Sequence, residues 1–137
     1  MQTFITDRNF SKSAENLDVR RLNAQVYEGI HILSSLLDVN HKLVNPKRSV
    51  LNHPITRMWK GHEESLLFYI AIHLREKRRR GHKLSGTINF QNYIFLCGLI
   101  SMKQIDSPEF ITDELIKEYK KKLYEKDSEF YSQWKNE

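Results

Sequence analysis

The chain has 137 residues, of which 39% are hydrophobic and 28% are charged, and its formal net charge is +5 at pH 7. This length predicts one domain over residues 1–137 with a modest core. No run approaches 18 apolar residues, so no membrane span is expected, and the first residues lack the features of a signal peptide. The single cysteine, Cys97, excludes an intramolecular disulfide and favours a cytoplasmic protein.

The positive charge is concentrated in one third of the chain. Residues 53–83 contain eight Lys and Arg residues against three Asp and Glu residues, an excess equal to the net charge of the whole chain. A concentrated basic segment is typical of proteins that bind phosphate groups. The distribution therefore favours an anionic partner.

The N-terminal part of the chain predicts a short extended segment followed by helices. Residues 1–7 are expected to be extended and to lie against the core. Ser11 or Ser13 can cap a short helical turn over residues 14–17. A long helix should then run from Leu17 to about residue 38, with an apolar face on which Leu22, Val26, Leu33 and Leu37 recur.

Within that long helix, Gly29 costs about 1 kcal/mol relative to Ala. A glycine inside a helix often marks close approach by another backbone or side chain. The residues 40–52 that follow read as a loop broken by Pro46.

A second helical region is expected to open at His53-Pro54, since proline suits a first helical position. Gly61 should interrupt it, and a further helix should run from about His62 to Arg80 and end at Gly81.

The segment 86–102 is aromatic and apolar, and it predicts a buried short helix around residues 90–99, with a single strand as the alternative. The last helix should run from Asp113 to about Lys126. Together these elements predict an all-α fold: a compact single domain of three main helices plus short helices and loops.

Several polar residues are candidates for binding or chemistry. Arg21, Gln25 and Glu28 are spaced to share one helix face, where Glu28 could instead be held in an internal salt bridge with arginine. The run Arg78–Arg80 is either a charged helix terminus or a DNA contact, and both can hold. None of the six histidines shares a short motif with acidic residues, so no metal site and no cofactor are expected.

The C-terminal aromatic residues also leave two interpretations open. Phe130, Tyr131 and Trp134 have the spacing of side chains that dock on a core, and they could also stack on extruded bases.

Three blocks of sequence carry a family resemblance. They are LDVRRLNAQVYE at Leu17–Glu28, HPITRMWKG at His53–Gly61 and the ending KKLYEKDSEFYSQW, together with the start MQTF. In order and spacing they resemble the pyrimidine-dimer DNA glycosylase family, to which the phage enzyme endonuclease V belongs, and more closely its bacterial branch.

The resemblance implies an all-helical enzyme of DNA repair that binds double-stranded DNA as a monomer. It implies that the N-terminal amine attacks C1′ of a damaged nucleotide to form an imine, that β-elimination then cuts the strand, and that a glutamate assists. The residues that the resemblance assigns to catalysis are Met1 or Gln2 for the amine and Glu28 for the carboxylate. Those assigned to DNA binding, with the basic and aromatic groups above, are Arg20, Arg21, Gln25, Arg57, Lys60, Arg78, Arg79, Arg80, Tyr131 and Trp134.

The chain departs from the phage enzyme at its start. The phage enzyme begins Met-Thr and loses the methionine, whereas Gln2 is too large for efficient removal of Met1, and Thr3 replaces a basic residue. Two other functions therefore stand beside the glycosylase: a DNA-binding module without catalysis, and a protein-interaction domain that uses Trp59 and the C-terminal aromatic residues as its contact surface.

Overall fold

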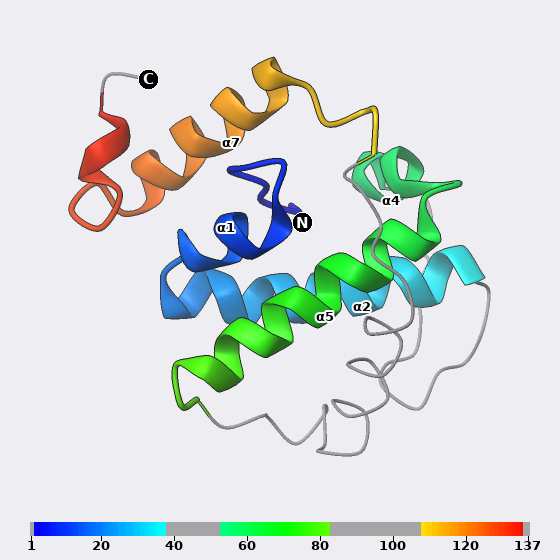
Figure 1. Ribbon diagram of the computed structural model, residues 1–137. Coiled ribbons are helices and arrows are strands. Elements are labelled where there is room, and N and C mark those ends of the chain that lie inside the picture. Colours follow the sequence, from blue (N-terminus) through cyan, green and yellow to red (C-terminus); the bar gives the residue numbers. More distant parts are fainter. Residues whose placement is uncertain (1, 38–52, 83–107, 136–137) are drawn as a thin grey trace.

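The computed structural model describes residues 2–37, 53–82 and 108–135, and over these residues the fold is helical. The helices are α1 (Phe10–Glu15), α2 (Val19–Leu37), α4 (Pro54–Trp59), α5 (Glu63–Arg79) and α7 (Asp113–Lys126), followed by the 3₁₀ turn η1 (Ser132–Trp134). Helices α2 and α5 cross and form the main packing pair, and α7 lies on the other side of the N-terminal segment (Figure 1). The predicted all-α class, with three main helices and shorter ones, is confirmed.

Helix α2 forms because its apolar residues recur every turn and pack against α5. Leu22, Val26 and Ile30 are buried at four-residue spacing. A Cβ atom added at Gly29 would lie 2.6 Å from Cγ1 of Ile70 on α5, so the close approach predicted at this glycine is confirmed. The absent side chain allows the two helices to pack at short range.

Helices α4 and α5 begin and end at the residues that the sequence indicated. His53 is the N-cap of α4, where its Nδ1 accepts a hydrogen bond from the Ile55 N–H at 3.1 Å, and Pro54 occupies the first turn. Gly61 and Gly81 have φ values of +87° and +79°, which only glycine adopts readily.

The start of α1 corrects one expectation. The helix runs over Phe10–Glu15 rather than over residues 14–17, and Asn9 caps it by accepting a hydrogen bond from the Lys12 N–H, so neither Ser11 nor Ser13 is the cap. Ser13 lies inside the helix and its hydroxyl accepts a hydrogen bond from the Thr6 N–H at 2.9 Å. Ser13, which local sequence preference suggested as a cap, thus makes a tertiary contact with the N-terminal segment instead.

Helix α7 has the predicted bounds, and Thr112 caps it by accepting a hydrogen bond from the Leu115 N–H. Beyond it, Tyr131 and Trp134 are buried, and their rings stack with centroids 5.1 Å apart and planes inclined by 10°. These two aromatic residues therefore dock on the core.

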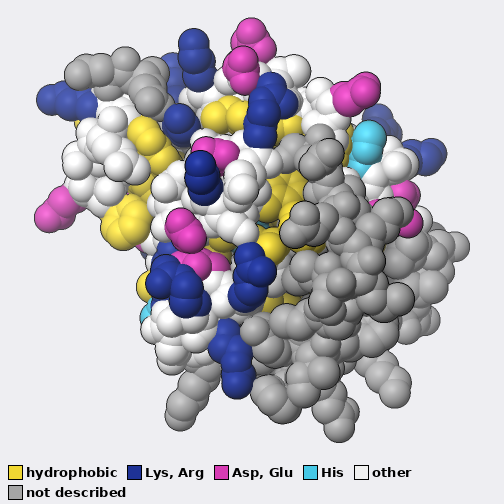
Figure 2. All heavy atoms as spheres, in the orientation of Figure 1, with side chains coloured by type: hydrophobic (Ala, Val, Ile, Leu, Met, Phe, Trp, Pro, Cys, Tyr) yellow, Lys and Arg dark blue, Asp and Glu magenta, His cyan; other side chains and the backbone are white. Residues whose placement is uncertain are grey.

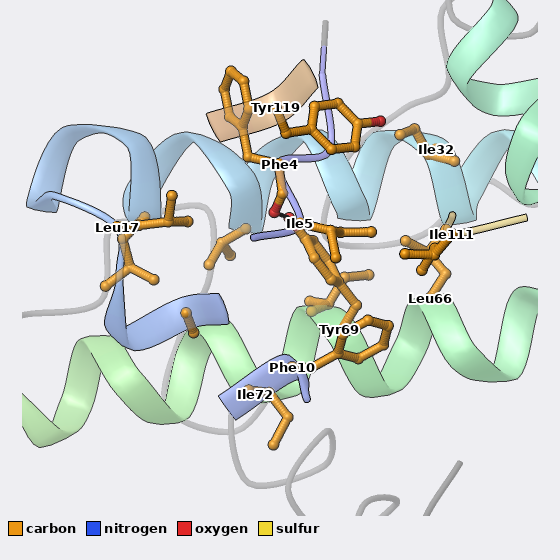
Figure 3. Packing of buried hydrophobic residues seen from close by; sticks show 14 of the residues in the cluster. Phe4, Ile5, Phe10, Leu17, Ile32, Leu66, Tyr69, Ile72, Ile111 and Tyr119 are labelled. Carbon is orange, nitrogen blue, oxygen red and sulfur yellow. Dashed lines mark hydrogen bonds between the residues drawn. The ribbon is translucent and has the colours of Figure 1, made fainter. Parts of the chain in front are cut away.

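The N-terminal segment is extended and buried, as predicted. Phe4 packs edge-on against Tyr119 of α7 with ring centroids 5.8 Å apart, and Tyr69 of α5 reaches the same region from below (Figure 3). Residues 3–6 are all buried between helices that come from distant parts of the chain. The predicted loop at residues 40–52 and the predicted short helix at residues 90–99 lie outside the described residues.

Candidate active site

The N-terminal segment is fixed by side chains of α2 and α5. The Phe4 N–H donates to Oε1 of Gln25 at 2.7 Å. The Tyr69 hydroxyl lies 2.9 Å from the Phe4 carbonyl oxygen and 2.6 Å from Oε1 of Gln25, so its single hydrogen is shared between two acceptors. The Trp59 indole N–H donates to the Thr3 hydroxyl at 3.0 Å. The first residues therefore have a defined depth and direction.

These anchors place Gln2 at Glu28. The Gln2 backbone nitrogen donates a hydrogen bond to Oε2 of Glu28 at 2.9 Å, and both residues are half-buried. The contact joins the start of the chain to the middle of α2, 26 residues later. The residues that the resemblance named for catalysis thus lie together at one point, except that Met1 is outside the described residues.

The pKa of the Glu28 carboxyl is raised from its ordinary value of 4.5, chiefly because burial disfavours its charged form. The hydrogen bond from the Gln2 N–H, the positive charge of Lys126 and a hydrogen bond with Gln25 lower this pKa, but by less than burial raises it. A carboxyl group with a raised pKa can exchange protons closer to neutral pH.

Arg21 does not serve as the partner that holds Glu28 ionised. Its Nη1 makes an ion pair with Oδ2 of Asp18 at 3.2 Å, one turn earlier on the chain. Tyr131 also binds Asp18: its hydroxyl accepts from the Asp18 N–H at 2.9 Å and donates to Oδ1 of the same residue. Tyr131, in the C-terminal segment, thereby orients the Asp18 carboxylate, and this carboxylate in turn orients Arg21.

Apart from Arg79 and Arg80, the other residues predicted to bind DNA fall into two groups. Arg20, Arg57, Lys60 and Arg78 are exposed and can reach a ligand from solvent. Gln25, Tyr131 and Trp134 are only 1%, 0% and 6% exposed, so bases and phosphates cannot reach their side chains in this structure. Phe130, the third aromatic residue that could stack on extruded bases, is 52% exposed and lies edge-on to Tyr131.

The arginines at the end of α5 are partly used inside the protein. Arg79 and Arg80 bind Oε1 of Glu76 at 2.6 and 2.8 Å, and Arg80 also donates to the carbonyl oxygens of Ala14 and Glu15 in α1. The helix-terminus interpretation of this run is therefore supported for Arg79 and Arg80.

Trp59 cannot be the contact surface that the protein-interaction hypothesis required. It is fully buried, and its ring packs against Tyr69 and Phe110. Figure 2 shows Lys and Arg side chains spread over the described part of one face and interleaved with Asp and Glu, without a single continuous basic patch.

No group of three or more His, Cys, Asp and Glu side chains that could hold a metal ion occurs within residues 2–37, 53–82 and 108–135. A cavity of about 300 Å³ lies between α1 and α5, and its lining includes neither Gln2 nor Glu28. In the same described residues, no helix has the length and hydropathy needed to cross a membrane.

Two residues at this site were not found from the sequence. Tyr69 has only the apolar spacing of a core residue, and Lys126 only the charge of a helix terminus. No local signal distinguishes either from its neighbours, because each is brought to the N-terminal segment or to Glu28 by the packing of a distant helix.

Comparison with known proteins identifies the family. The sequence model of a family described as pyrimidine dimer DNA glycosylase matches residues 1–89, which include the N-terminal segment, α2, α4 and α5. The chain belongs to this family. No curated protein and no solved structure matches the chain.

Membership of the pyrimidine dimer DNA glycosylase family supports a general function in DNA repair as a DNA glycosylase, with DNA as the substrate. The placement in the bacterial branch, the monomeric state and the cytoplasmic location stay predictions from the sequence.

Proposed function

We propose that the protein is a DNA repair glycosylase with AP-lyase activity on damaged double-stranded DNA, with pyrimidine dimers as one candidate lesion. In this proposal the N-terminal amine forms an imine with the deoxyribose, and Glu28 transfers protons. The observation that carries it is the 2.9 Å hydrogen bond between the Gln2 nitrogen and Oε2 of Glu28.

Covalent geometry keeps the amine near Glu28 whether or not the first methionine is removed. If Met1 is kept, its amine is joined to the Gln2 nitrogen through three bonds of known length, which limit their separation to about 4 Å. If Met1 is removed, the Gln2 nitrogen is itself the amine and already contacts Glu28. An α-amino group has a pKa of about 7.7–8.0, so a useful fraction is neutral and nucleophilic near pH 7.

The proposed reaction balances with the groups present. The amine nitrogen attacks C1′ and forms a bond to it. The glycosidic bond between C1′ and the base nitrogen breaks, and the base leaves with that electron pair and takes up a proton. Loss of a proton from the nitrogen and opening of the C1′–O4′ bond, with a proton going to O4′, give the imine. Removal of a proton from C2′ then breaks the C3′–O bond and expels the phosphate, which cuts the strand.

Glu28 suits both proton transfers because the pKa of its carboxyl is raised by burial. A carboxyl of this kind can donate a proton to O4′ and then, as the carboxylate, accept the proton from C2′. The exposed Arg20, Arg57 and Lys60 are proposed to bind the phosphates of the duplex, and Arg21 joins them from its Asp18 partner.

The test is covalent trapping. The full chain is incubated with a duplex that contains an abasic site, and in parallel with an ultraviolet-irradiated duplex, in the presence of borohydride. Hydride reduces the imine to a stable secondary amine, so a protein–DNA adduct should appear, and blocking the N-terminal amine by acetylation should abolish it.

The outcomes separate the candidate functions. Adduct formation that survives N-terminal acetylation would contradict the proposed nucleophile. Salt-sensitive DNA binding without adduct or nicking would leave a DNA-binding module that lacks catalysis. Absence of DNA binding at low salt would contradict both the glycosylase and the non-catalytic DNA-binding module.

Peptide mapping of the adduct identifies the reactive residue. An N-terminal glutamine closes on its own side-chain amide and releases ammonia, which leaves a lactam nitrogen that cannot form an imine. We therefore expect the sugar on Met1, and we expect the Gln2→Ala variant, from which methionine is removed efficiently, to carry it on residue 2.

A further inference from the structure

The backbone of Phe4 has both of its polar groups bound by buried side chains. Gln25 accepts from the Phe4 N–H, and the Tyr69 hydroxyl lies at hydrogen-bond distance from the Phe4 carbonyl oxygen. Gln25 is 1% exposed and Tyr69 is fully buried. An amide and a hydroxyl in a core cost free energy unless they are hydrogen-bonded, and here they bind the chain two residues after Gln2.

Gln25 and Glu28 lie on one face of the same helix, where both bind the N-terminal segment. They are three residues apart on α2, so their side chains lie one above the other. In an extended segment the N–H groups of alternate residues point to the same side, and Gln2 and Phe4 are such a pair. Glu28 therefore binds the N–H of residue 2 while Gln25 binds that of residue 4, with the segment antiparallel to α2.

Tyr69 fixes this arrangement from the opposite side. Its hydroxyl also lies 2.6 Å from Oε1 of Gln25, so the amide, the hydroxyl and the Phe4 backbone form one closed network between α2 and α5. Tyr69 is held in turn by its packing against Trp59 and Phe10. The network links the position of the N-terminal segment to the packing of α2 on α5.

We infer that Gln25 and Tyr69 are positioning residues that hold the N-terminal amine at the Glu28 carboxylate. This role rests on the proposed function, and it replaces the DNA contact first predicted for Gln25. Neither side chain touches substrate. Tyr69 acts through the backbone of Phe4, and Gln25 acts through the same backbone and through its own hydrogen bond with Glu28. Misplacement of a reacting group by about 1 Å can lower a rate by about 100-fold, so the anchor controls rate rather than affinity.

The first experiment compares Gln25→Met and Tyr69→Phe with the wild-type chain. Each removes a polar group and keeps the size of the side chain. The rate constant for borohydride trapping is measured in a single turnover with saturating abasic duplex, and affinity is measured with an uncleavable duplex. We expect trapping to slow by roughly 10- to 100-fold, and the Kd to stay within about twofold because neither residue touches DNA.

Two control variants separate positioning from general instability. Gln25→Glu keeps an acceptor oxygen for Phe4 and Tyr69, and it should restore trapping to within about threefold of wild type at its own optimal pH. Ile72→Val removes a buried methylene from the same helix without touching the network, and it should leave the trapping rate unchanged.

A second measurement does not depend on catalysis. The N-terminal amine is acylated by a small amine-reactive ester in the absence of DNA, and the N-terminal peptide is quantified by mass spectrometry. The amine should react about tenfold faster in Gln25→Met and Tyr69→Phe than in the wild type and Ile72→Val, because one anchoring hydrogen bond is lost.

The two measurements distinguish failure of the inference from failure of the proposed function. If the wild type traps DNA and the anchor variants trap it equally fast, Gln25 and Tyr69 do not position the amine. If the wild type forms no adduct, the proposed lyase fails, and the acylation rates alone decide whether the network holds the N-terminus. Equal acylation rates in all variants would overturn the inference in either case.

Discussion

Burial disfavours the ionised form of two glutamates in this protein, but the pKa values of their carboxyl groups are shifted in opposite directions. Glu28 is half-buried beside the N-terminal segment, and the pKa of its carboxyl is raised because burial outweighs the hydrogen bond from Gln2. Glu76 is buried near the end of α5, and the pKa of its carboxyl is lowered, first by the hydrogen bond from Arg79 and then by Arg80. Burial opposes ionisation at both sites, and arginine partners reverse the result at only one.

The difference separates a reactive group from a structural one. Glu76 is held ionised by Arg79 and Arg80, and through Arg80 it ties α5 to the end of α1. Glu28 receives one backbone N–H, and the nearest arginine on its helix face, Arg21, is bound to Asp18. A carboxyl left without an arginine in a half-buried site keeps the ability to exchange protons.

The largest effect is expected from Glu28→Gln. The amide keeps an acceptor for the Gln2 N–H but cannot transfer protons, so single-turnover cleavage of an abasic duplex should fall by roughly 100- to 1,000-fold. The raised pKa means that the folded state disfavours the ionised form. The variant should therefore be at least as stable as the wild type at pH 7, and this advantage should vanish as the pH falls toward 4.5.

Chemical denaturation at both pH values checks the stability statement, and gel-resolved cleavage checks the rate. A variant that cleaves within threefold of the wild-type rate would remove Glu28 from the mechanism. A variant that is destabilised at pH 7 would contradict the raised pKa.

The next effect concerns His73, which lies on α5 one turn before Glu76. Burial lowers the pKa of His73 from 6.5 to about 4, and its Nδ1 donates to the Tyr69 carbonyl oxygen at 2.7 Å. Between pH 6.5 and 4 the unfolded chain binds a proton that the folded chain does not, so stability falls as the pH is lowered. The loss should reach about 3 kcal/mol at pH 4.

His73→Gln has no imidazole to protonate and should lack this part of the pH dependence. Urea denaturation at pH 7 and pH 4 measures the difference between the variant and the wild type. An unchanged difference at the two pH values would show that His73 is protonated equally in the folded and unfolded chains.

Glu76→Gln should lower the free energy of unfolding by about 2 kcal/mol at pH 7, because a half-buried Arg80 loses a charged partner. Since the lowered pKa stabilises the folded state only while Glu76 is ionised, the difference from wild type should shrink below pH 4.5. Trapping of abasic DNA should remain within about threefold of wild type. A 100-fold loss of trapping without unfolding would place the α5 arginines in catalysis.

The smallest effect is expected from Asp113→Asn, which removes the charge that pairs with Arg8 and keeps the hydrogen bond from Arg8 Nη1 to the Ile111 carbonyl oxygen at 2.8 Å. Arg8 makes an ion pair with Asp113 at 3.0 Å, but the two side chains are 53% and 79% exposed. Solvent screens such a pair, so the free energy of unfolding should fall by less than about 1 kcal/mol. Thermal or urea denaturation tests this value, and a loss as large as that of Glu76→Gln would show that exposure does not separate the two ion pairs.

Four helices and the family could be predicted from the sequence alone. Apolar spacing, Pro54 at a first turn and Gly61 and Gly81 at helix ends are local signals, and the structure places α2, α4, α5 and α7 within two residues of the predicted limits. These signals suffice because helix bounds depend on hydrogen bonds and side-chain contacts within about four residues. The sequence blocks at Leu17–Glu28 and His53–Gly61, with the start MQTF and the C-terminal ending, likewise predicted the family that the family model identifies.

The partners of the buried polar side chains at the site, in contrast, could be assigned only from the packing of the helices. Gln25 shares a helix face with charged residues, which predicted a DNA contact, yet it binds Phe4. Tyr131 is an aromatic residue that could stack on bases, yet it binds Asp18, 113 residues away. Local sequence cannot specify such partners, because the free energy of a buried polar group depends on a donor or acceptor brought in by another helix. The two arginine partners of Glu76 are its neighbours on the same helix, at i+3 and i+4, and local spacing suffices for such pairs. The backbone N–H that Glu28 binds comes instead from the N-terminal segment, 26 residues away, and only the packing of that segment on α2 brings it there.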